Sequence, residues 1–239
     1  MITEAKMNRK IIVAISYVLS FVFLMSVSLC EAKNAEPAVG DIFVFGRYEQ
    51  DNNIANGPEP IEWIILEVKT NDTLLLISKY ALDAQPYNTE YTDVTWETCT
   101  LREWLNDIFY TKAFDTEEQA RILTTKVINE NNSHYDTEGG NDTEDKVWLL
   151  SIADAFAYFK YYDERMCAPI KYAIAQGVHQ TENYKIDGIN TCWWWMRSPG
   201  WTSLHAARIE FDGSIIVNGN LVDATDRGIR PVIVVQPNS

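Results

Sequence analysis

The sequence predicts an α+β fold, with antiparallel β-strands at both ends of the chain and helices in the middle. Short apolar blocks bounded by turn residues occupy residues 41–78 and again residues 193–235, a pattern typical of strands. Between these regions, apolar residues recur at intervals of three and four, which indicates amphipathic helices. About two hundred residues remain once an amino-terminal signal is set aside, which suits one domain with a sizeable core.

The amino-terminal 35 residues are typical of an export signal. Lys6, Arg9 and Lys10 precede an apolar stretch over residues 11–29, and small or polar residues follow it. We therefore expect a signal peptide over residues 1–35, a single mature domain over residues 36–239, and a protein that is secreted or held in the cell envelope.

Two alternatives for this segment stay open. The apolar stretch is close to the length that spans a bilayer, so it is also suited to an uncleaved membrane anchor. Cys30 stands where a lipoprotein signal places the cysteine that becomes lipidated, although Leu29 before it is larger than the usual residue there.

The chain is strongly acidic. It carries 20 Lys+Arg against 34 Asp+Glu, and the part after residue 35 holds 16 basic and 32 acidic residues, a net charge of −16. Such a field repels nucleic acid and anionic membrane surfaces. We expect no nucleic-acid partner, and contact with a membrane only through the amino-terminal segment.

The amino-terminal strands form a predicted meander. Apolar blocks at residues 41–48, 61–68 and 73–78 are separated by a loop over residues 49–60 and a turn at residues 71–72. Consecutive strands joined by such turns usually pair with each other, so we expect about three antiparallel strands.

The middle of the chain is predicted to be helical. Apolar positions spaced by three and four run from Leu101 to Phe109, with Thr98 and Thr100 as candidate amino-terminal caps. Asp115 begins a second helical stretch.

A polar loop over residues 129–146 and a short strand over residues 147–151 follow. The next helix is expected over residues 152–162, with Ala155, Phe156 and Phe159 facing inward.

The carboxy-terminal third returns to strands. Trp193 to Arg197 forms one strand, Asp212-Gly213 is a strong hairpin signal, and Asn218-Gly219-Asn220 predicts a second turn. Pro231 lies in the last strand, and a proline there implies a sheet edge or a bulge.

Ordered motifs along most of the mature chain resemble a bacterial family known as domain of unknown function 6273. That family is found largely in exported and cell-surface proteins and has no established activity, so no catalytic position is carried over from it. The motifs are GRYEQ at 46–50, PIEW at 60–63, LISKYAL at 76–82, TWE at 95–97, LREWLN at 101–106, LLS at 149–151, YAIAQG at 172–177, CWWWMRSPG at 192–200 and GIRP at 228–231.

The carboxy-terminal pattern also resembles the C-type-lectin-like fold shared by sulfatase-modifying factors and retroelement-diversified binding proteins. This resemblance implies that the first and last strands pair, with residues 42–45 beside residues 229–235.

An enzyme of the formylglycine-generating type would need a cysteine pair and copper. Cys99, Cys167 and Cys192 remain after signal removal, an odd number that allows at most one internal disulfide. Their ordinary interpretation is as small buried hydrophobes. His134, His179 and His205 lie far apart in the sequence, so a zinc site built from them is a remote alternative.

Calcium is the more natural metal for an acidic exported domain, since hard cations take carboxylate, amide and carbonyl ligands. No cofactor is otherwise predicted. Asp223 and Asp226 are minor candidates within the polar group of residues 212–226, and similar groups occur at residues 51–56 and 141–145. The alternative is that these are solvated turn residues.

The aromatic residues offer the best case for binding. Trp201 lies in a loop, and Trp194 faces opposite to Trp193 and Trp195 along a strand, so both are candidates for an apolar platform as well as for core packing. The predicted ligand-binding set is Trp194, Trp201, His205, Asp212, Asn218 and Asn220. Arg197 and Arg230 are expected to be buried ion-pair partners of acids such as Glu62.

These observations predict an exported or cell-surface binding module that recognises a carbohydrate or a protein through its carboxy-terminal loops. Two alternatives remain: an oxidoreductase related to formylglycine-generating enzymes, and a structural envelope protein, in which Trp194 and Trp201 would both be covered by the chain itself.

Overall fold

The computed structural model describes residues 36–237, and the described residues from Ala38 onward belong to one compact unit. The predicted export signal, the alternative membrane anchor and the lipidation of Cys30 fall outside the described residues. Within residues 36–237, no helix combines the length and the apolar character needed to cross a bilayer.

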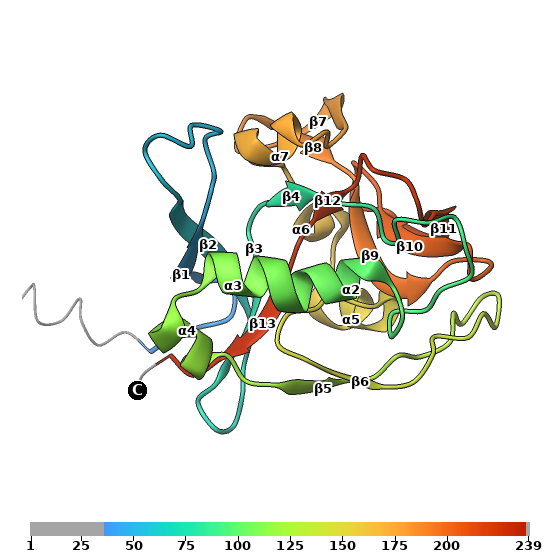
Figure 1. Ribbon diagram of the computed structural model, residues 1–239, viewed down its shortest axis with the longest axis horizontal. Coiled ribbons are helices and arrows are strands. Elements are labelled where there is room, and N and C mark those ends of the chain that lie inside the picture. The colour runs from blue at the N-terminus through green and yellow to red at the C-terminus, as the bar shows by residue number, and fades with distance from the viewer. Residues whose placement is uncertain (1–35, 238–239) are drawn as a thin grey trace, which may run out of the picture. The chain divides into compact units, whose positions relative to one another are not determined.

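The first sheet has four strands in the order β1-β2-β3-β13 (Figure 1). Strands β1 (Ile42–Tyr48), β2 (Glu59–Val68) and β3 (Leu74–Ser78) form the predicted antiparallel meander. All residues of β3 are buried, whereas β1 exposes Ile42 and Val44, as an edge strand does.

The predicted pairing of the first and last strands is wrong. Strand β13 (Val232–Val235) pairs antiparallel with β3, from Val232 opposite Ile77 to Val235 opposite Leu74. Because β3 is buried throughout, its backbone N–H and C=O groups need partners along both edges, and β13 supplies those of the second edge.

The second sheet has five strands in the order β11-β10-β9-β12-β4. These are β4 (Asp83–Ala84), β9 (Trp194–Pro199), β10 (His205–Ile209), β11 (Ile215–Leu221) and β12 (Gly228–Ile229). Strands β9 and β12 run parallel, with Gly228 opposite Trp194, while the other pairs are antiparallel. The fold is therefore mixed α+β, and its strands are mostly but not entirely antiparallel.

The last two strands belong to different sheets. Between them, Arg230 and Pro231 carry the chain from β12 to β13, and the Pro231 carbonyl accepts a hydrogen bond from Ser78 N (2.9 Å). Pro231 therefore marks a crossing between sheets rather than the predicted edge or bulge, and a residue without an N–H suits that place.

The carboxy-terminal hairpin is only partly as predicted. The Asp212-Gly213 turn joins β10 to β11, and Gly213 N donates to Glu210 O (3.0 Å). The second turn predicted at Asn218-Gly219-Asn220 is wrong, since these residues lie inside β11. Gly219 adopts φ +73° where the register with β10 shifts, so the glycine produces an irregularity within the strand.

A continuous helical run crosses the face of the molecule in Figure 1, formed by α2 (Thr100–Trp104), the π-helical segment η1 (Leu105–Phe109) and α3 (Tyr110–Ala113). The predicted caps are wrong. Neither Thr98 nor Thr100 caps this run through its side chain; Asn88 Oδ1, from a distant loop, accepts from Thr100 N (3.1 Å).

The remaining helices are short. Helix α4 spans Thr116–Arg121, and Asp115, where a helical stretch was predicted to start, is its N-cap. Asp115 and Glu118 form a capping box. Helix α5 (Ile152–Tyr158) ends four residues before the predicted boundary, and α6 (Tyr162–Arg165) and α7 (Lys171–Ala175) follow. Ala155 in α5 and Phe159, the residue just after the helix, face inward as predicted. Phe156 is 61% exposed, contrary to the prediction, because it lies one position off the buried face.

Two small ribbons complete the fold, one from β5 (Thr125–Val127) and β6 (Thr143–Asp145), the other from β7 (Gln180–Ile186) and β8 (Ile189–Cys192). The strand predicted over residues 147–151 is reduced to a single bridge between Trp148 and Val232. Trp63, Trp96 and Trp148 are buried in the core, and Trp104 packs against it at its edge.

Candidate functional site

The three consecutive tryptophans divide differently from the predicted alternation. Trp194 and Trp195 are both completely buried, and their indole N–H groups donate to Arg165 O (3.0 Å) and Gln85 O (3.0 Å). Trp194 therefore has no free surface for a ligand, contrary to its place in the predicted binding set. The reason is that β9 lies inside the second sheet, where both of its faces are covered.

Trp193 is the member of the run that reaches the surface in part. The guanidinium groups of Arg227 and Arg208 lie 3.9 and 5.0 Å from its ring centroid, and Phe211 packs against it at 4.7 Å. These contacts cover the ring with the chain's own side chains, which leaves Trp193 a packing role.

Trp201 is 53% exposed, and contacts with Asn218 and His205 fix its position. Its backbone N–H donates to Asn218 O (3.1 Å), and its ring packs edge-on against His205 at 5.2 Å. His205 Nδ1 lies 2.8 Å from Thr202 Oγ1, and burial lowers the pKa of this imidazole below its ordinary value. A neutral His205 at physiological pH thus supports one edge of the Trp201 ring.

The segment from Gly200 to His205, which we call the Trp201 loop, is fixed by buried Asn132. The Asn132 side-chain nitrogen lies within hydrogen-bond distance of the carbonyl oxygens of Pro199 (2.8 Å), Gly200 (3.2 Å) and Val217 (2.7 Å). Asn132 is 1% exposed. The sequence analysis missed it, because one asparagine in a polar loop gives no signal of its distant partners.

The segment before α2 also binds the Trp201 loop, through Asp93 and Val94. Val94 N donates to Ser203 O (3.1 Å), and the Ser203 hydroxyl donates to Asp93 Oδ1. The Trp201 loop is thus bound to the segment before α2 and to the segment between β5 and β6, which are far apart in the sequence.

These loops enclose a polar hollow of about 530 Å³, which we call the acidic hollow. Three carboxylates lie in its wall, and Glu97 also accepts hydrogen bonds from Asn141 N (3.3 Å) and Asn141 Nδ2 (3.0 Å). Gly140, at φ +87°, lets the chain approach closely, since a Cβ there would stand 2.6 Å from Thr95 Oγ1. The lining residues are Asp93, Val94, Thr95, Glu97, Thr98, Asn131, Glu138, Gly140, Asn141 and Ser203.

The structure brings together part of the predicted binding set. Asn218 adjoins Trp201 through its carbonyl, and Asn220 lies opposite Ala206, next to His205, with its Oδ1 accepting from Leu221 N (2.9 Å). Asp212 lies at the other end of the hairpin, in the turn, where its Oδ1 accepts from Ser214 N (2.9 Å). Asp212 therefore does not belong to the surface around Trp201.

The predicted calcium candidates do not gather into a site of several carboxylates. Asp226 pairs with Arg227, and among the described residues the one group of three acidic side chains with converging oxygens is Glu49, Asp51 and Glu59.

The carboxylate oxygens of these three residues already accept hydrogen bonds from backbone N–H groups of the loop after β1. Asn53 N donates to both Glu49 and Asp51 (2.8 Å each), and Gln50 N donates to Glu59 (2.8 Å). The hydrogen bond from Asn56 lowers the pKa of Asp51. These contacts give the acidic residues a role in shaping the loop.

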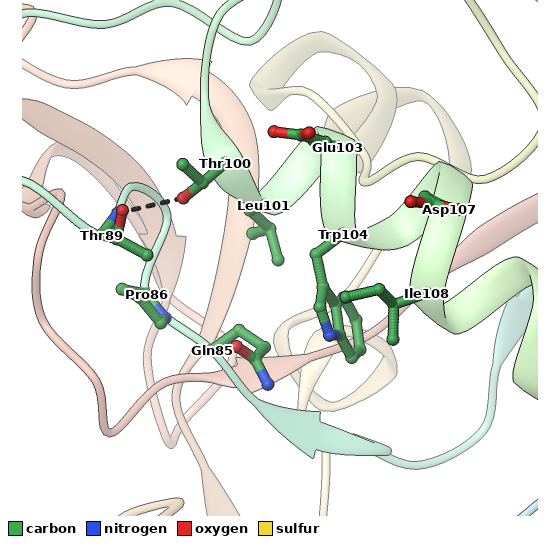
Figure 2. A pocket seen from close by; sticks show the side chains of 9 residues that line it. All are labelled: Gln85, Pro86, Thr89, Thr100, Leu101, Glu103, Trp104, Asp107 and Ile108. Atoms are coloured by element: carbon green, nitrogen blue, oxygen red, sulfur yellow. Dashed lines mark hydrogen bonds between the residues drawn. The ribbon is translucent and has the colours of Figure 1, made fainter.

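A second, less polar hollow of about 220 Å³ lies against the helical run (Figure 2). The side chains of Trp104 and Ile108 face Gln85 and Pro86 across it, and Thr89 N donates to Thr100 Oγ1 (3.0 Å) at one end. Trp104, which packs against the core, thus also forms a wall of this hollow.

Of the two arginines predicted to be buried in ion pairs, Arg197 and Arg230, the first forms such a pair and the second does not. Arg197 pairs with Asp154, and also donates to the carbonyls of Leu149 and Ile128 (2.9 Å each). Glu62, the acid suggested as a partner, instead pairs with Lys79 (2.8 Å). Arg230 is buried, but no carboxylate of residues 36–237 lies within ion-pair distance of it.

Fold and surface together define a single mixed α+β unit whose loops, set by buried hydrogen bonds, present one exposed tryptophan beside an acidic hollow. A family model, described as a domain of unknown function (DUF6273), matches residues 71–237, and the chain belongs to this family. Neither a curated protein nor a solved structure gives a significant match.

Proposed function

We propose that this protein is an exported or cell-surface binding module that holds a carbohydrate ligand between Trp201 and the acidic hollow. The observation that carries the proposal is the half-exposed Trp201 ring on a loop fixed by Asn132, a loop whose Ser203 lines a hollow of about 530 Å³. A rigid aromatic side chain beside converging polar groups is the usual form of a small-ligand site.

The chemistry of the surface favours a sugar. The face of an indole ring packs against the C–H groups of a sugar, while carboxylate and amide oxygens accept hydrogen bonds from its hydroxyl groups. Asp93, Glu97 and Glu138 provide such acceptors within the hollow. Calcium, if it takes part, would bind these same oxygens together with the sugar hydroxyls.

Exposure of Trp201 supports binding over a purely structural envelope role. A structural protein gains by covering its large apolar side chains, as this chain does with Trp194. Leaving Trp201 half in water on a firmly anchored loop gives up that gain, which supports a role in contact with a ligand.

We further propose the C-type-lectin-like fold for this domain. A tryptophan-bearing strand followed by a hairpin and then by the Gly-Ile-Arg-Pro segment of residues 228–231 supports this proposal. The position of β1 and β13 at opposite edges of one sheet is a departure from it. Superposition of an experimental structure of this domain on C-type-lectin-like domains would support the proposal, and superposition on a different fold class would oppose it.

The test of function is the Trp201→Ala variant, compared with wild type on glycan and peptide arrays in the presence and absence of calcium. We expect glycan binding to fall at least about tenfold, since buried aromatic contacts commonly contribute about 2 kcal/mol or more. The urea unfolding midpoint should stay unchanged, because the ring is half exposed.

Phe156→Ala is the matched control, since Phe156 is an exposed aromatic residue on α5, away from the Trp201 loop. It should bind as the wild type does. Equal binding by Trp201→Ala and wild type would overturn the proposal, and binding to peptides alone would transfer the site to a protein ligand.

An oxidoreductase function is the second candidate. It is favoured by one observation, the direct contact between the Cys167 and Cys192 backbones, with Cys192 N donating to Cys167 O (2.8 Å). This candidate does not depend on Trp201, and the properties of the cysteine pair can be tested separately.

A further inference from the structure

Arg230 is a cation enclosed in the protein. Its side chain is 1% exposed, Nε donates to Ser78 O (2.9 Å), and Nη1 has no hydrogen-bond partner. The rings of Trp194 and Phe159 lie 5.1 and 5.7 Å from the guanidinium carbon. A guanidinium stays protonated in proteins, and a buried charge without a counter-charge costs several kcal/mol. A negative group beside Arg230 would offset that cost.

Two thiols are the ionisable groups that face Arg230. Burial lowers the pKa of Arg230, and negative charge on Cys167 or Cys192 would raise it again. Both cysteines are at most 1% exposed. Gly228 leaves room for them, since a Cβ at that position would stand 3.2 Å from Cys192 Sγ.

The backbone holds the two cysteines at a separation that a disulfide can span. Cys192 N donates to Cys167 O over 2.8 Å. With standard bond lengths this hydrogen bond limits the Cα–Cα distance to about 6.7 Å. Disulfides join Cα atoms about 4.4–6.8 Å apart. In the structure both thiols are free.

The two thiols are electrostatically unequal. Burial raises the pKa of Cys167, but the hydrogen bond from Cys192 and the charge of Arg230 outweigh it and bring this pKa below its ordinary value. Burial and the neighbouring Cys167 raise the pKa of Cys192 well above its ordinary value. The surroundings therefore favour ionisation of Cys167 over ionisation of Cys192.

We propose that Cys167 and Cys192 are a redox-active pair whose reduced form is stabilised by Arg230. In that form the Cys167 thiolate is the counter-charge of the buried guanidinium. Closing the disulfide removes this charge and leaves Arg230 uncompensated, so oxidation is opposed. A pair whose reduced form is stabilised in this way is a comparatively strong oxidant when it carries the disulfide.

The reaction takes place by exchange with a small disulfide such as oxidised glutathione, which reaches the buried sulfurs when the surrounding segment opens locally. The Cys167 thiolate attacks one sulfur of the reagent, which forms a mixed disulfide and releases one glutathione thiolate. The Cys192 thiol gives up its proton, and its sulfur attacks Cys167 Sγ and displaces the second glutathione as a thiolate. The products are one protein disulfide, one glutathione thiol and one glutathione thiolate, which balances atoms, electrons and charge.

The first experiment equilibrates the full chain in glutathione buffers of graded ratio, blocks free thiols under denaturing conditions, and maps the linked peptides by mass spectrometry. The chain has four cysteines, and we expect the disulfide to join Cys167 to Cys192. No such linkage at any ratio, or a linkage that includes Cys99 instead, would overturn the proposal.

The same titration on Arg230→Met measures the role of the charge. An opposite charge at this range shifts a thiol pKa by about one to three units, so the ratio of disulfide to dithiol should rise about tenfold or more at a given buffer composition. Arg230→Lys, which keeps the charge, should lie between the two. An unchanged ratio in Arg230→Met would contradict the stabilisation.

A measurement that needs no Arg230 variant keeps the proposal testable if that variant fails to fold. The difference in absorbance at 240 nm between wild type and Cys167→Ser, followed with pH, reports the thiolate of Cys167. We expect its midpoint below about 8.5, the ordinary value for a cysteine. Burial alone predicts a midpoint above it, and that result would refute the thiolate–guanidinium pair. Neither outcome bears on glycan binding at Trp201.

Discussion

Asp83 is a carboxylate that is almost completely enclosed, at 3% exposure. It accepts hydrogen bonds from the Tyr48 hydroxyl (2.5 Å) and from Ala84 N (2.7 Å). Burial nevertheless raises the pKa of Asp83, and burial together with the Asp83 charge raises the pKa of Tyr48 far above its ordinary value. The strand that bears Asp83, β4, is the edge of the second sheet, and its contact with Tyr48 links this edge to β1.

Asp83 should make the stability of the fold depend on pH. Its pKa is raised in the folded state relative to about 3.9 when unfolded, so its contribution is complete below about pH 4 and is lost as the pH rises through the folded value. We therefore expect the free energy of unfolding of wild type, relative to Asp83→Asn, to fall as the pH rises from about 4 towards 7. Urea denaturation at several pH values measures this.

Asp142→Asn is the control for the pH experiment. Asp142 is exposed, and its hydrogen bond from Lys126 lowers its pKa, so any effect has the opposite sign and is lost as the pH falls. A flat difference between wild type and Asp83→Asn would contradict the assignment of a raised pKa to Asp83.

At the level of elements, the hairpin between β10 and β11 depends on contact with α6. Gly213 accepts a hydrogen bond from Arg165 Nε (2.7 Å), and Arg165 O in turn accepts from the Trp194 indole. A Cβ on Gly213 would stand 1.8 Å from Tyr162 O. The glycine is thus required both by its positive φ of +82° and by the close approach of the helix.

A pair of alanine variants can separate the cost of the positive φ from the cost of the close contact with Tyr162. Gly188, in the β7–β8 turn, has a similar φ of +79° but no atom within 4 Å of its missing Cβ. Gly188→Ala should cost about 1–2 kcal/mol, the price of the left-handed conformation. Gly213→Ala should cost clearly more, about 4 kcal/mol, because the backbone of α6 must move. Equal losses in urea unfolding would show that the contact with Tyr162 contributes nothing.

For the whole molecule, the carboxy-terminal strands join the two sheets. β12 pairs with β4 and β9, and after Arg230 and Pro231 the chain continues as β13 along β3. Every residue of β13 is buried. The last strands therefore complete a core whose other members come from all parts of the chain.

A chain that ends at Ile229 should fail to fold. The truncation exposes β3 and removes four buried apolar residues. Each contributes about 1.5–3 kcal/mol, and their sum is comparable to the whole stability of an ordinary domain, about 5–15 kcal/mol. Circular dichroism and tryptophan fluorescence would show this. Inserting two glycines between Asp187 and Gly188, in an exposed turn, should leave folding intact. Cooperative unfolding of the shortened chain would contradict the joining role of β13.

The sequence by itself determined the order of the elements and much of the core. The meander of β1 to β3, the start of α4 at Asp115 and the Asp212-Gly213 turn depend on residues close together in the chain, so local pattern was sufficient to predict them. The same holds for family membership, since motifs are a property of sequence. Trp201 could be singled out in this way because proline and glycine just before it indicate a loop.

The tertiary structure alone decided which faces are covered and which distant residues meet. Alternation along β9 suggested an outward Trp194, but the second sheet is covered on both faces, so Trp194 is buried. Asn132 fixes the Trp201 loop from 68 residues away, and Cys167, Cys192 and Arg230 gather at one point from separate elements. Such contacts depend on sheet order and chain crossings, which are set by the packing of the whole core rather than by local sequence.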